Sequence, residues 1–382
     1  MDAKILPTDP KAGYLAHKQE IDDAVRRVCE KGWYILGDEV DQFEGEFASY
    51  VGVAHGIGVA SGTDAIELAL RACGVGRDSV VLTVSHTAVA TVAAIERCGA
   101  SVALVDIDPA TFTIDVKELE RAYASCAGRA AAIVPVHLYG HPADMPAITE
   151  FARRHDLYVI EDCAQAHGAQ IDGKKVGAWG HLAAFSFYPT KNLGGLGDGG
   201  MVVTDDVALG EATKALREYG WKQRYISDTP GINSRLDELQ AAILRIRLRY
   251  LDQENAERQR LAAVYDSHLA AAGLVLPATT PGCTHVYHQY VVRTSHRDVL
   301  REHLNRHGIG TLSHYPAAVH QQPAYANLPQ ATSLHQTEQV VAEILSLPMY
   351  PQFDEKRAAM VAEQVLAWSQ QHREALAGEA ER

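Results

Sequence analysis

The chain has 382 residues, enough for two domains, and 47% of them are apolar, enough for a sizeable core. Its formal net charge of −13 argues against nucleic-acid binding or an anionic-membrane partner, although local NH groups and a few cations could still hold a small anion. No apolar run reaches the roughly 18 residues of a membrane span, and the N-terminus lacks the apolar region of a signal peptide. The six dispersed cysteines favour reduced thiols and a cytoplasmic location.

The first part of the chain combines amphipathic helices with a turn suited to anions. Helical spacing of apolar residues covers 14–31 and continues from Val40 to Tyr50. Residues 54–60 then read as a strand and 65–70 as a helix, joined by Ser61-Gly62-Thr63-Asp64. Backbone NH groups at such a helix start can hold a phosphate. Taken alone, an ordinary helix N-cap is the more common explanation.

Strand and helix patterns alternate over the next hundred residues. This alternation predicts an α/β fold, a three-layer domain with a mostly parallel sheet, whose ligands lie beyond the carboxyl ends of the strands. The predicted strands are 79–84, 101–106, 131–137, 157–162 and 183–187, with helices over 89–98 and 145–155. The loops expected to converge on one crevice are 61–63, 85–87, 137–140 and 161–165.

Two ionisable residues follow predicted strands. Asp162 ends one strand, where a carboxylate could form a turn or face a cationic ring nitrogen. Lys191 lies beyond the next strand, before a loop with five glycines between 194 and 200 and a further strand over 201–204. Keeping a lysine from water favours its neutral amine, which Schiff-base chemistry requires. Considered alone, this lysine is better explained as a surface residue in a flexible turn.

The carboxylate, the lysine and the upstream turn have one shared explanation, pyridoxal 5'-phosphate (PLP). An anion keeps the pyridine nitrogen of this cofactor protonated, so that the ring withdraws electrons. A lysine carries the aldehyde as an imine and later moves protons, and a helix N-terminus holds the phosphate. The sequence therefore predicts a PLP site built from Ser61-Gly62-Thr63, Asp162 and Lys191.

The second half predicts a smaller domain. Residues 211–250 are mainly helical, with a basic and aromatic interruption at 217–225, and a long helix opens near Asn233 and runs through Leu251. We expect a large PLP-binding domain over 1–250 and a small α+β domain over 251–382. The predicted elements of the small domain are strands at 284–293 and 310–314 and helices near 297–307 and 355–376.

The chain resembles the DegT/StrS-type sugar aminotransferases, which are fold-type I PLP enzymes, over roughly residues 10–365. The motifs that carry the resemblance lie at 37–40, 61–65, 161–169 and 186–194. The resemblance implies that Lys191 forms the Schiff base, that Asp162 pairs with the pyridine nitrogen, and that Gln165 lies near the ring hydroxyl. The family usually places an aromatic residue over the ring where this chain has Ala88, so the nearby His86 is a candidate to stack there instead, or a loop residue without a ligand.

The same resemblance implies how the phosphate is held. Gly62, Thr63 and Ser186 match phosphate contacts within one subunit. Asn233 matches an asparagine that reaches the phosphate of the neighbouring subunit. That match implies a homodimer with shared active sites.

The C-terminal half resembles the branch that aminates nucleotide-linked 3-keto deoxyhexoses. The matching segments are 219–225, 308–316 and 320–325. In that branch Tyr188, His314 and Tyr315 contact the sugar, and neutral histidine and tyrosine suit its hydroxyls. Without the resemblance, His314-Tyr315 would be a strand-ending turn. Arg224 could meet the sugar diphosphate or the donor carboxylate, or be a solvated charge.

The sequence therefore predicts a PLP-dependent aminotransferase that uses L-glutamate and a nucleotide-diphosphate keto sugar, a dTDP-3-keto-6-deoxyhexose. One alternative is amination at C4 of a UDP- or GDP-linked sugar. A PLP-dependent sugar dehydratase is disfavoured because family members of that kind have histidine at the position of Lys191. A non-catalytic PLP-binding regulator is disfavoured by the complete set of Lys191, Asp162 and His314.

Overall fold

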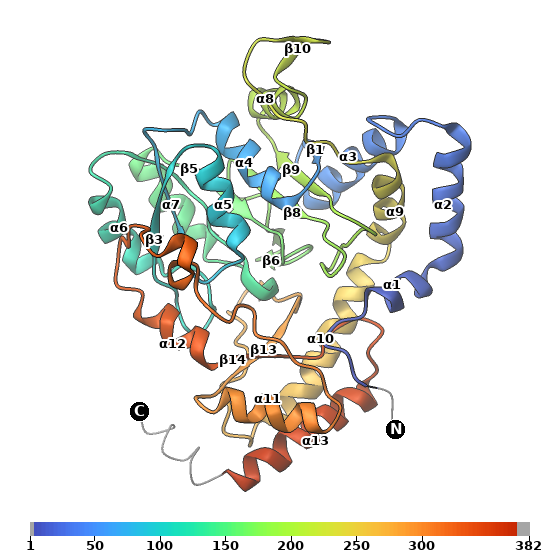
Figure 1. The fold of residues 1–382 in the computed structure, drawn as a ribbon, viewed down its shortest axis with the longest axis vertical. Coiled ribbons are helices and arrows are strands. Elements are labelled where there is room, and N and C mark those ends of the chain that lie inside the picture. The colour runs from blue at the N-terminus through green and yellow to red at the C-terminus, as the bar shows by residue number, and fades with distance from the viewer. Residues whose placement is uncertain (1–3, 373–382) are drawn as a thin grey trace.

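A seven-stranded sheet forms the centre of the computed structural model, which describes residues 4–372 (Figure 1). Strand β9, which lies between β1 and β8, runs antiparallel to both, and the other four pairings of this sheet are parallel. The predicted mostly parallel sheet is therefore confirmed. Its spatial order is β1 (His55–Val59), β9 (Gly200–Thr204), β8 (Leu182–Ser186), β5 (Tyr158–Asp162), β4 (Ala130–Ile133), β2 (Val80–Val84) and β3 (Ser101–Val105).

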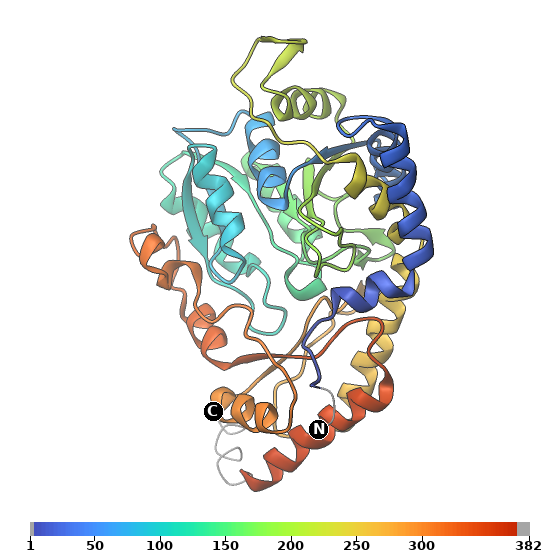
Figure 2. The ribbon, with the colours of Figure 1, turned by 45° about the vertical axis from the view of Figure 1, so that its right-hand side comes forward.

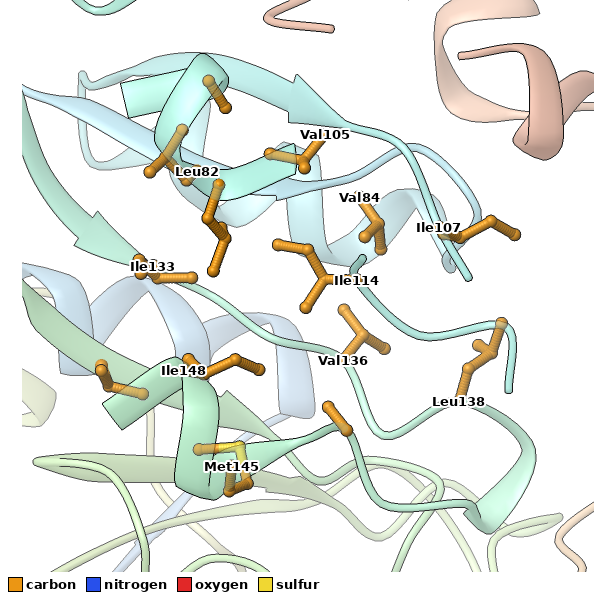
Figure 3. Close-up of a cluster of buried hydrophobic side chains, with 14 of the residues drawn as sticks. Leu82, Val84, Val105, Ile107, Ile114, Ile133, Val136, Leu138, Met145 and Ile148 are labelled. Atoms are coloured by element: carbon orange, nitrogen blue, oxygen red, sulfur yellow. The ribbon is translucent and has the colours of Figure 1, made fainter. Parts of the chain in front are cut away.

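Both faces of the sheet are covered, which explains the continuous apolar runs of its strands. Along β2, Leu82 and Val84 enter one hydrophobic core, whereas Val81 enters the core on the opposite face. Figure 3 shows part of the first core, where Leu82, Val105 and Ile133 come from three neighbouring strands. Alternate side chains of a strand point to opposite faces, so one apolar strand supports two helical layers.

The two helical layers complete the three-layer arrangement. Buried residues of α4 (Gly62–Ala72), α5 (Val89–Arg97) and α8 (Val207–Arg217) share the core of one face. The other face is covered by α3 (Asp38–Val51), α6 (Leu119–Ser125), α7 (Met145–His155) and α9 (Glu238–Leu248). The N-terminal helices α1 (Pro10–Ala16) and α2 (Lys18–Lys31) precede these layers, and α2 packs on α9.

The bounds of helix α7 are set by local features of the sequence, namely a capping residue at its start and a left-handed residue at its end. Asp144 caps its start by accepting a 3.1 Å hydrogen bond from the NH group of Ala147. Ile148 and Phe151 lie on its buried face, and Asp156 ends it in a left-handed conformation. The predicted helix at 145–155 is confirmed.

A smaller unit lies below the sheet in Figure 1. Its core joins α10 (Leu251–Leu269), α11 (Arg297–Arg306) and α13 (Glu355–Gln371) to the antiparallel pair β13 (Tyr290–Arg293) and β14 (Ile344–Leu347). Ile5 bridges Ile309, so the N-terminal segment also belongs here. Val319 and Leu334 return to a core of the large sheet. The predicted domain boundary at residue 250 stays a prediction. A segment before it packs in the smaller unit, and segments after it pack on the large sheet.

Several predicted elements differ from the structure. The expected strand at 310–314 is wrong, because Leu312 makes only an isolated bridge to Ser346. The long helix through Leu251 is two helices, α9 and α10, and residues 233–237 before it are not helical. β4 ends at Ile133, so the strand expected over 131–137 is shorter. Helix α13 ends at Gln371, and residues 373–376 of its predicted extent lie outside the described residues.

The interruption at 217–225 leads into a hairpin that projects from the body (Figures 1 and 2). Its strands are β10 (Trp221–Gln223) and β11 (Ile226–Ser227). The strand predicted over 284–293 is interrupted, because only its two ends are strands, in β12 (Cys283–Thr284) and β13. Elements that the sequence did not predict include β6 (Gln170–Ile171) and β7 (Lys174–Lys175), which form a small sheet with β12, the helix α12 (His335–Glu343), and the short helical turns η1 (Val116–Glu118), η2 (Leu138–Gly140), η3 (Val319–Gln321) and η4 (Pro323–Tyr325). Among residues 4–372, no helix combines the length and the apolar character needed to cross a bilayer.

Candidate active site

A cavity of about 430 Å³ opens at the carboxyl ends of the parallel strands. The ends of β5 and β8 place Asp162 and Ser186 in its wall, and the turn after β1 adds Ser61. Three of the four loops predicted to converge, 61–63, 85–87 and 161–165, contribute to its lining, whereas the loop at 137–140 does not. The sequence-predicted residues that line this cavity are Gly62, Thr63, Asp162, Gln165, Ser186, Tyr188, Lys191, His314 and Tyr315.

Lys191 lies in the turn after β8, where its backbone NH donates a 2.9 Å hydrogen bond to the carbonyl of Tyr188. Burial of the amine lowers the pKa of Lys191 to about 8, and the charge of Asp162 opposes this shift. At pH 7 about a tenth of the amine would then be unprotonated, far more than for a lysine of ordinary pKa. That form is the nucleophile needed to attack an aldehyde.

Asp162 is only 5% exposed and is held in place through both carboxylate oxygens. Oδ2 accepts a 2.8 Å hydrogen bond from the Thr91 hydroxyl, and Oδ1 accepts one from the NH group of Ala164. Burial raises the pKa of Asp162, and the bonds from Thr91 and Ala164 counteract that rise. The Thr91 hydrogen is used on Asp162, so Thr87 Oγ1, 2.9 Å away, is the donor to Thr91. A buried carboxylate fixed in this way suits a cationic ring nitrogen.

Gln165 connects the two halves of the site. Its Oε1 accepts a 2.8 Å hydrogen bond from the NH group of Tyr139, which fixes the orientation of the amide. Its Nε2 therefore carries the hydrogens and donates one of them to the Tyr315 hydroxyl at 3.1 Å. The second amide hydrogen can serve a ring oxygen in the cavity.

The start of α4 has the shape of a phosphate cradle. Ser61 Oγ accepts a 3.1 Å hydrogen bond from the NH group of Asp64, so the turn is also an N-cap. A Cβ atom added to Gly62 would lie 2.6 Å from Cβ of Ser186, and this space is kept free by the glycine. Gly62, Thr63 and Ser186 line the same cavity, which brings the helix start and two hydroxyl-bearing residues together. This donor set fits a phosphate group.

His86 lies behind the cavity wall. It is 1% exposed, and its ring is 2.9 Å from the hydroxyl of Tyr139, which in turn donates to the carbonyl of His314. Within residues 4–372, the lining of the cavity includes Ala88 and not His86. The stacking of His86 on the ring stays a prediction, and this position does not favour it.

The predicted sugar contacts lie at the outer part of the cavity. Tyr188 is 52% exposed at its mouth, whereas His314 and Tyr315 form a more enclosed wall. His314 Nδ1 is 2.9 Å from the hydroxyl of Ser346, and burial lowers the pKa of His314 to about 4. Burial raises the pKa of Tyr315 to about 12. Both groups are therefore neutral near pH 7.

Arg224 and Asn233 lie away from this cavity. Asn233 is exposed and bridges Glu218, next to the projecting hairpin. Arg224 lies on the hairpin and lines a separate groove of about 980 Å³. Its aromatic lining consists of Trp33, Tyr34, Tyr219, Trp221 and Tyr225.

The sequence missed several residues of the site. Thr91 lies in the first turn of α5, four residues after Thr87 of the predicted loop at 85–87, and only this spacing could have indicated their link to Asp162. Thr8 reaches the cavity from the N-terminal segment, for which the sequence carries no signal. His288 and Gln289 also line it, although the strand pattern predicted both as part of a strand.

Comparison with known proteins decides the family. Residues 16–366 match the model of the DegT/DnrJ/EryC1/StrS aminotransferase family. The chain belongs to this family. It is a PLP-dependent aminotransferase, and the predicted fold type, enzyme class and cofactor are confirmed.

The similarity extends to specific relatives. A dTDP-3-amino-3,4,6-trideoxy-alpha-D-glucose transaminase of Streptomyces venezuelae is 47% identical over 364 residues, which cover 95% of each chain. The crystal structure of S. venezuelae DesV in complex with a ketimine intermediate has a TM-score of 0.93 and 46% identity, and the match covers 96% of this chain and 99% of DesV. The structure of ntda from Bacillus subtilis with bound cofactor PMP has a TM-score of 0.85 and 30% identity, and the match covers 92% and 82% of the chains.

Proposed function

We propose that this aminotransferase moves an amino group from L-glutamate to the keto carbon of a nucleotide-linked sugar, and that its acceptor is a dTDP-3-keto-6-deoxyhexose. One observation carries the proposal: Lys191 and Asp162 face the same cavity as Tyr188, His314 and Tyr315. The name of the S. venezuelae transaminase at 47% identity supports the acceptor class and amination at C3.

The residues divide the work between cofactor and substrate. Bound PLP supplies an electron-withdrawing ring that makes the hydrogen next to the amino group acidic. Lys191 would hold the cofactor through its amine, and the same amine could move a proton when it is free. Asp162 would keep the ring nitrogen protonated, and Gln165 would donate to the ring oxygen. The α4 N-terminus, Thr63 and Ser186 would hold the phosphate.

The outer wall provides recognition of the sugar. His314 and Tyr315 are neutral near pH 7, so each offers a donor and an acceptor to hydroxyl groups. Tyr188 adds a hydroxyl at the cavity mouth, where the sugar enters. These groups would orient the keto carbon toward Lys191 and keep water from the reacting atoms.

We also propose a homodimer with shared sites. The groove beside the hairpin exposes 59% of Trp33 and 73% of Tyr225, more aromatic surface than a monomer usually leaves in water. A second copy would cover this surface and bring the partner subunit's Asn233 to the phosphate and the partner subunit's Arg224 to an anionic part of the substrate. All six cysteines are free thiols, which supports a cytoplasmic location.

The test is product analysis by NMR after incubation with L-glutamate and dTDP-, UDP- and GDP-linked keto sugars. A C3 amine on the dTDP sugar is expected, and a C4 amine on a UDP or GDP sugar would replace this proposal with the alternative regiochemistry. A protein that binds PLP but turns over no sugar would instead be a regulator. The Lys191→Ala variant should lose turnover, and full activity of that variant would contradict the mechanism.

A further inference from the structure

Tyr139 lies behind the wall of the active-site cavity, in the loop at 137–140 to which the proposed chemistry gives no role. It is 2% exposed, belongs to the turn η2, and within residues 4–372 is not part of the cavity lining. Its φ of 58° is left-handed, a backbone conformation that a bulky residue adopts only when its surroundings impose it. Such strain is common at functional sites.

Both backbone polar groups of Tyr139 bind residues that line the cavity. Its NH group donates to Gln165 Oε1 at 2.8 Å, and Gln165 Nε2 in turn donates to the hydroxyl of Tyr315 at 3.1 Å. Its carbonyl accepts a 3.3 Å hydrogen bond from the NH group of Gln289, which precedes β13. Parts of the cavity wall that are far apart in the sequence are therefore held by the same turn.

The side chain of Tyr139 reaches a further part of the wall. Its hydroxyl donates its single hydrogen to the backbone carbonyl of His314, because a carbonyl can only accept. Burial raises the pKa of this hydroxyl well above its usual range, so the hydroxyl keeps its hydrogen. In the 2.9 Å contact between the hydroxyl and His86 Nε2, the imidazole must then be the donor. Burial lowers the pKa of His86 to about 3, so the ring is neutral, with its proton on Nε2 and a lone pair on Nδ1.

The wall formed by His314 and Tyr315 reaches the cavity from the smaller unit. On that side Ser346 of β14 holds it, because the Ser346 hydroxyl is 2.9 Å from His314 Nδ1. On the side of the large sheet, the hydroxyl of Tyr139 holds His314 and the amide of Gln165 holds Tyr315. Since the NH group of Tyr139 also orients that amide, two neighbouring residues of the wall depend on one tyrosine.

We propose that Tyr139 is a positioning residue for the acceptor sugar, whose hydroxyl, oriented by a hydrogen bond from His86, holds the wall of His314 and Tyr315 in place. The bonds are Nε2–H···Oη from His86 and Oη–H···O=C to His314, and no proton is transferred. The hydroxyl serves only this outer wall, whereas the backbone NH group serves Gln165 at the cofactor end. This inference rests on the proposed function, in which the outer wall binds the sugar.

Tyr139→Phe tests the hydroxyl alone, because the ring and both backbone groups are kept. L-glutamate and the keto sugar react in separate half-reactions, so kcat/KM for each substrate reports only its own half. In Tyr139→Phe, kcat/KM for the dTDP-3-keto-6-deoxyhexose should fall by about fivefold, as expected for the loss of one hydrogen bond. The value for L-glutamate should stay within about twofold of the wild type, whereas a general structural defect would lower both values together.

Tyr265→Phe is the matched control. Tyr265 is fully buried, and its hydroxyl also donates to a backbone carbonyl, that of Pro348, at 2.9 Å. Within the described part of the chain it does not line the cavity. Its loss should lower the thermal stability of the protein and leave the ratio of the two kcat/KM values unchanged.

His86→Phe tests the donor that orients the hydroxyl. It should lower kcat/KM for the keto sugar by a smaller factor, about threefold, because the bond from Tyr139 to His314 survives without its orienting partner. The value for L-glutamate should again stay within about twofold of the wild type. A fall confined to the L-glutamate value would contradict this role of His86 and would favour stacking on the cofactor.

An unchanged kcat/KM for the keto sugar in Tyr139→Phe, an equal loss for L-glutamate, or the same selective loss in Tyr265→Phe would overturn the inference. Nitrogen-15 NMR of the histidine rings in the wild-type holoenzyme gives a check without turnover. His86 should be protonated on Nε2, and a proton on Nδ1 would also overturn the inference.

Product analysis of the wild type tests the proposed function separately. If the wild type aminates a UDP- or GDP-linked sugar instead, that sugar takes the place of the dTDP sugar in the same comparison. A wild type that aminates no keto sugar refutes the proposed function and this inference together. Amination by the wild type without a selective loss in Tyr139→Phe refutes this inference alone.

Discussion

A Cβ atom placed on Gly62 would lie 2.6 Å from Cβ of Ser186, closer than real Cβ atoms approach one another. The first residue of α4 and the last residue of β8 therefore touch across the predicted phosphate cradle. Relief of this contact would require one of the two segments to move. The shape of the cradle depends on the absence of a side chain at residue 62.

Gly62→Ala is accordingly expected to weaken PLP binding by about tenfold or more, a loss of roughly 1.4 kcal/mol. Equilibrium titration of the cofactor-free protein by absorbance measures this effect. Gly45→Ala is the matched control, because Gly45 is a helical glycine with open space around its Cβ position. The control should bind PLP normally, and equal affinities of the two variants would contradict the role of the cradle.

Thr91 offers a test of the ring-nitrogen site. Thr91→Val removes the hydrogen bond to Asp162 with little change in volume, so the pKa of the Asp162 carboxyl should rise and its charge should be less stable. We expect kcat to fall by about tenfold, equivalent to about 1.4 kcal/mol, with the protein still folded. The measurement is steady-state turnover together with thermal unfolding.

Thr213→Val is the control for the preceding experiment. Thr213 is also a buried helical threonine, but its hydroxyl donates to the backbone carbonyl of Leu209 in its own helix. Its removal should leave kcat within about twofold of the wild-type value. A comparable loss in both variants would indicate a general packing defect.

Buried neutral histidines make the enzyme sensitive to acid. Burial lowers the pKa of His86 and of His167 to about 3 and that of His314 to about 4, whereas unfolded histidine titrates near 6.5. Below about pH 6.5 the unfolded chain binds protons that the folded chain does not, so the free energy of unfolding should fall as the pH decreases. Each histidine contributes up to about 1.4 kcal/mol per pH unit.

Urea unfolding at about pH 7.5, 6.5, 5.5 and 4.5 tests this expectation. In the wild type the free energy of unfolding should fall at each step below about pH 6.5. His167→Phe should reduce the slope of the free energy of unfolding against pH by the contribution of one proton. His167 lies among Phe47, Phe185 and Phe187, and the new ring cannot titrate. A slope that the variant does not change would contradict the assignment.

The exposed aromatic groove provides a test of assembly. Tyr225→Asp should weaken dimer formation, because a carboxylate would replace an aromatic ring that is 73% exposed and is proposed to contact the second subunit. Sedimentation velocity over a range of concentrations measures this change. Met360→Asp, at an exposed apolar residue of α13, should leave the dimer intact. An undisturbed dimer in Tyr225→Asp would argue that the groove is not the interface.

The parts of the fold that could be predicted have local causes. Asp162 and Lys191 follow apolar strands whose ends share one edge of a parallel sheet, so the sequence pattern alone places them together. The bond from Thr91 to Asp162 joins residues 71 positions apart, and the hydrogen bonds of Tyr139 reach four other segments of the chain. No periodicity marks such contacts. The hairpin at 221–227 was missed because an exposed two-stranded ribbon carries no alternating apolar pattern.

The glycine loop after Lys191 has a consequence for sequence variation. None of the glycines at 194, 195, 197, 199 and 200 has a positive φ, so larger residues there would be opposed by neighbours and not by backbone strain. Gly194 faces the backbone of Pro189, and Gly200 faces that of Ser61, and neither backbone can yield. Gly197 faces only the flexible end of Gln240. Among homologues and in selected libraries, alanine or serine should therefore be accepted first at 197 and last at 194 and 200, which gives this loop a graded mutational tolerance along its length.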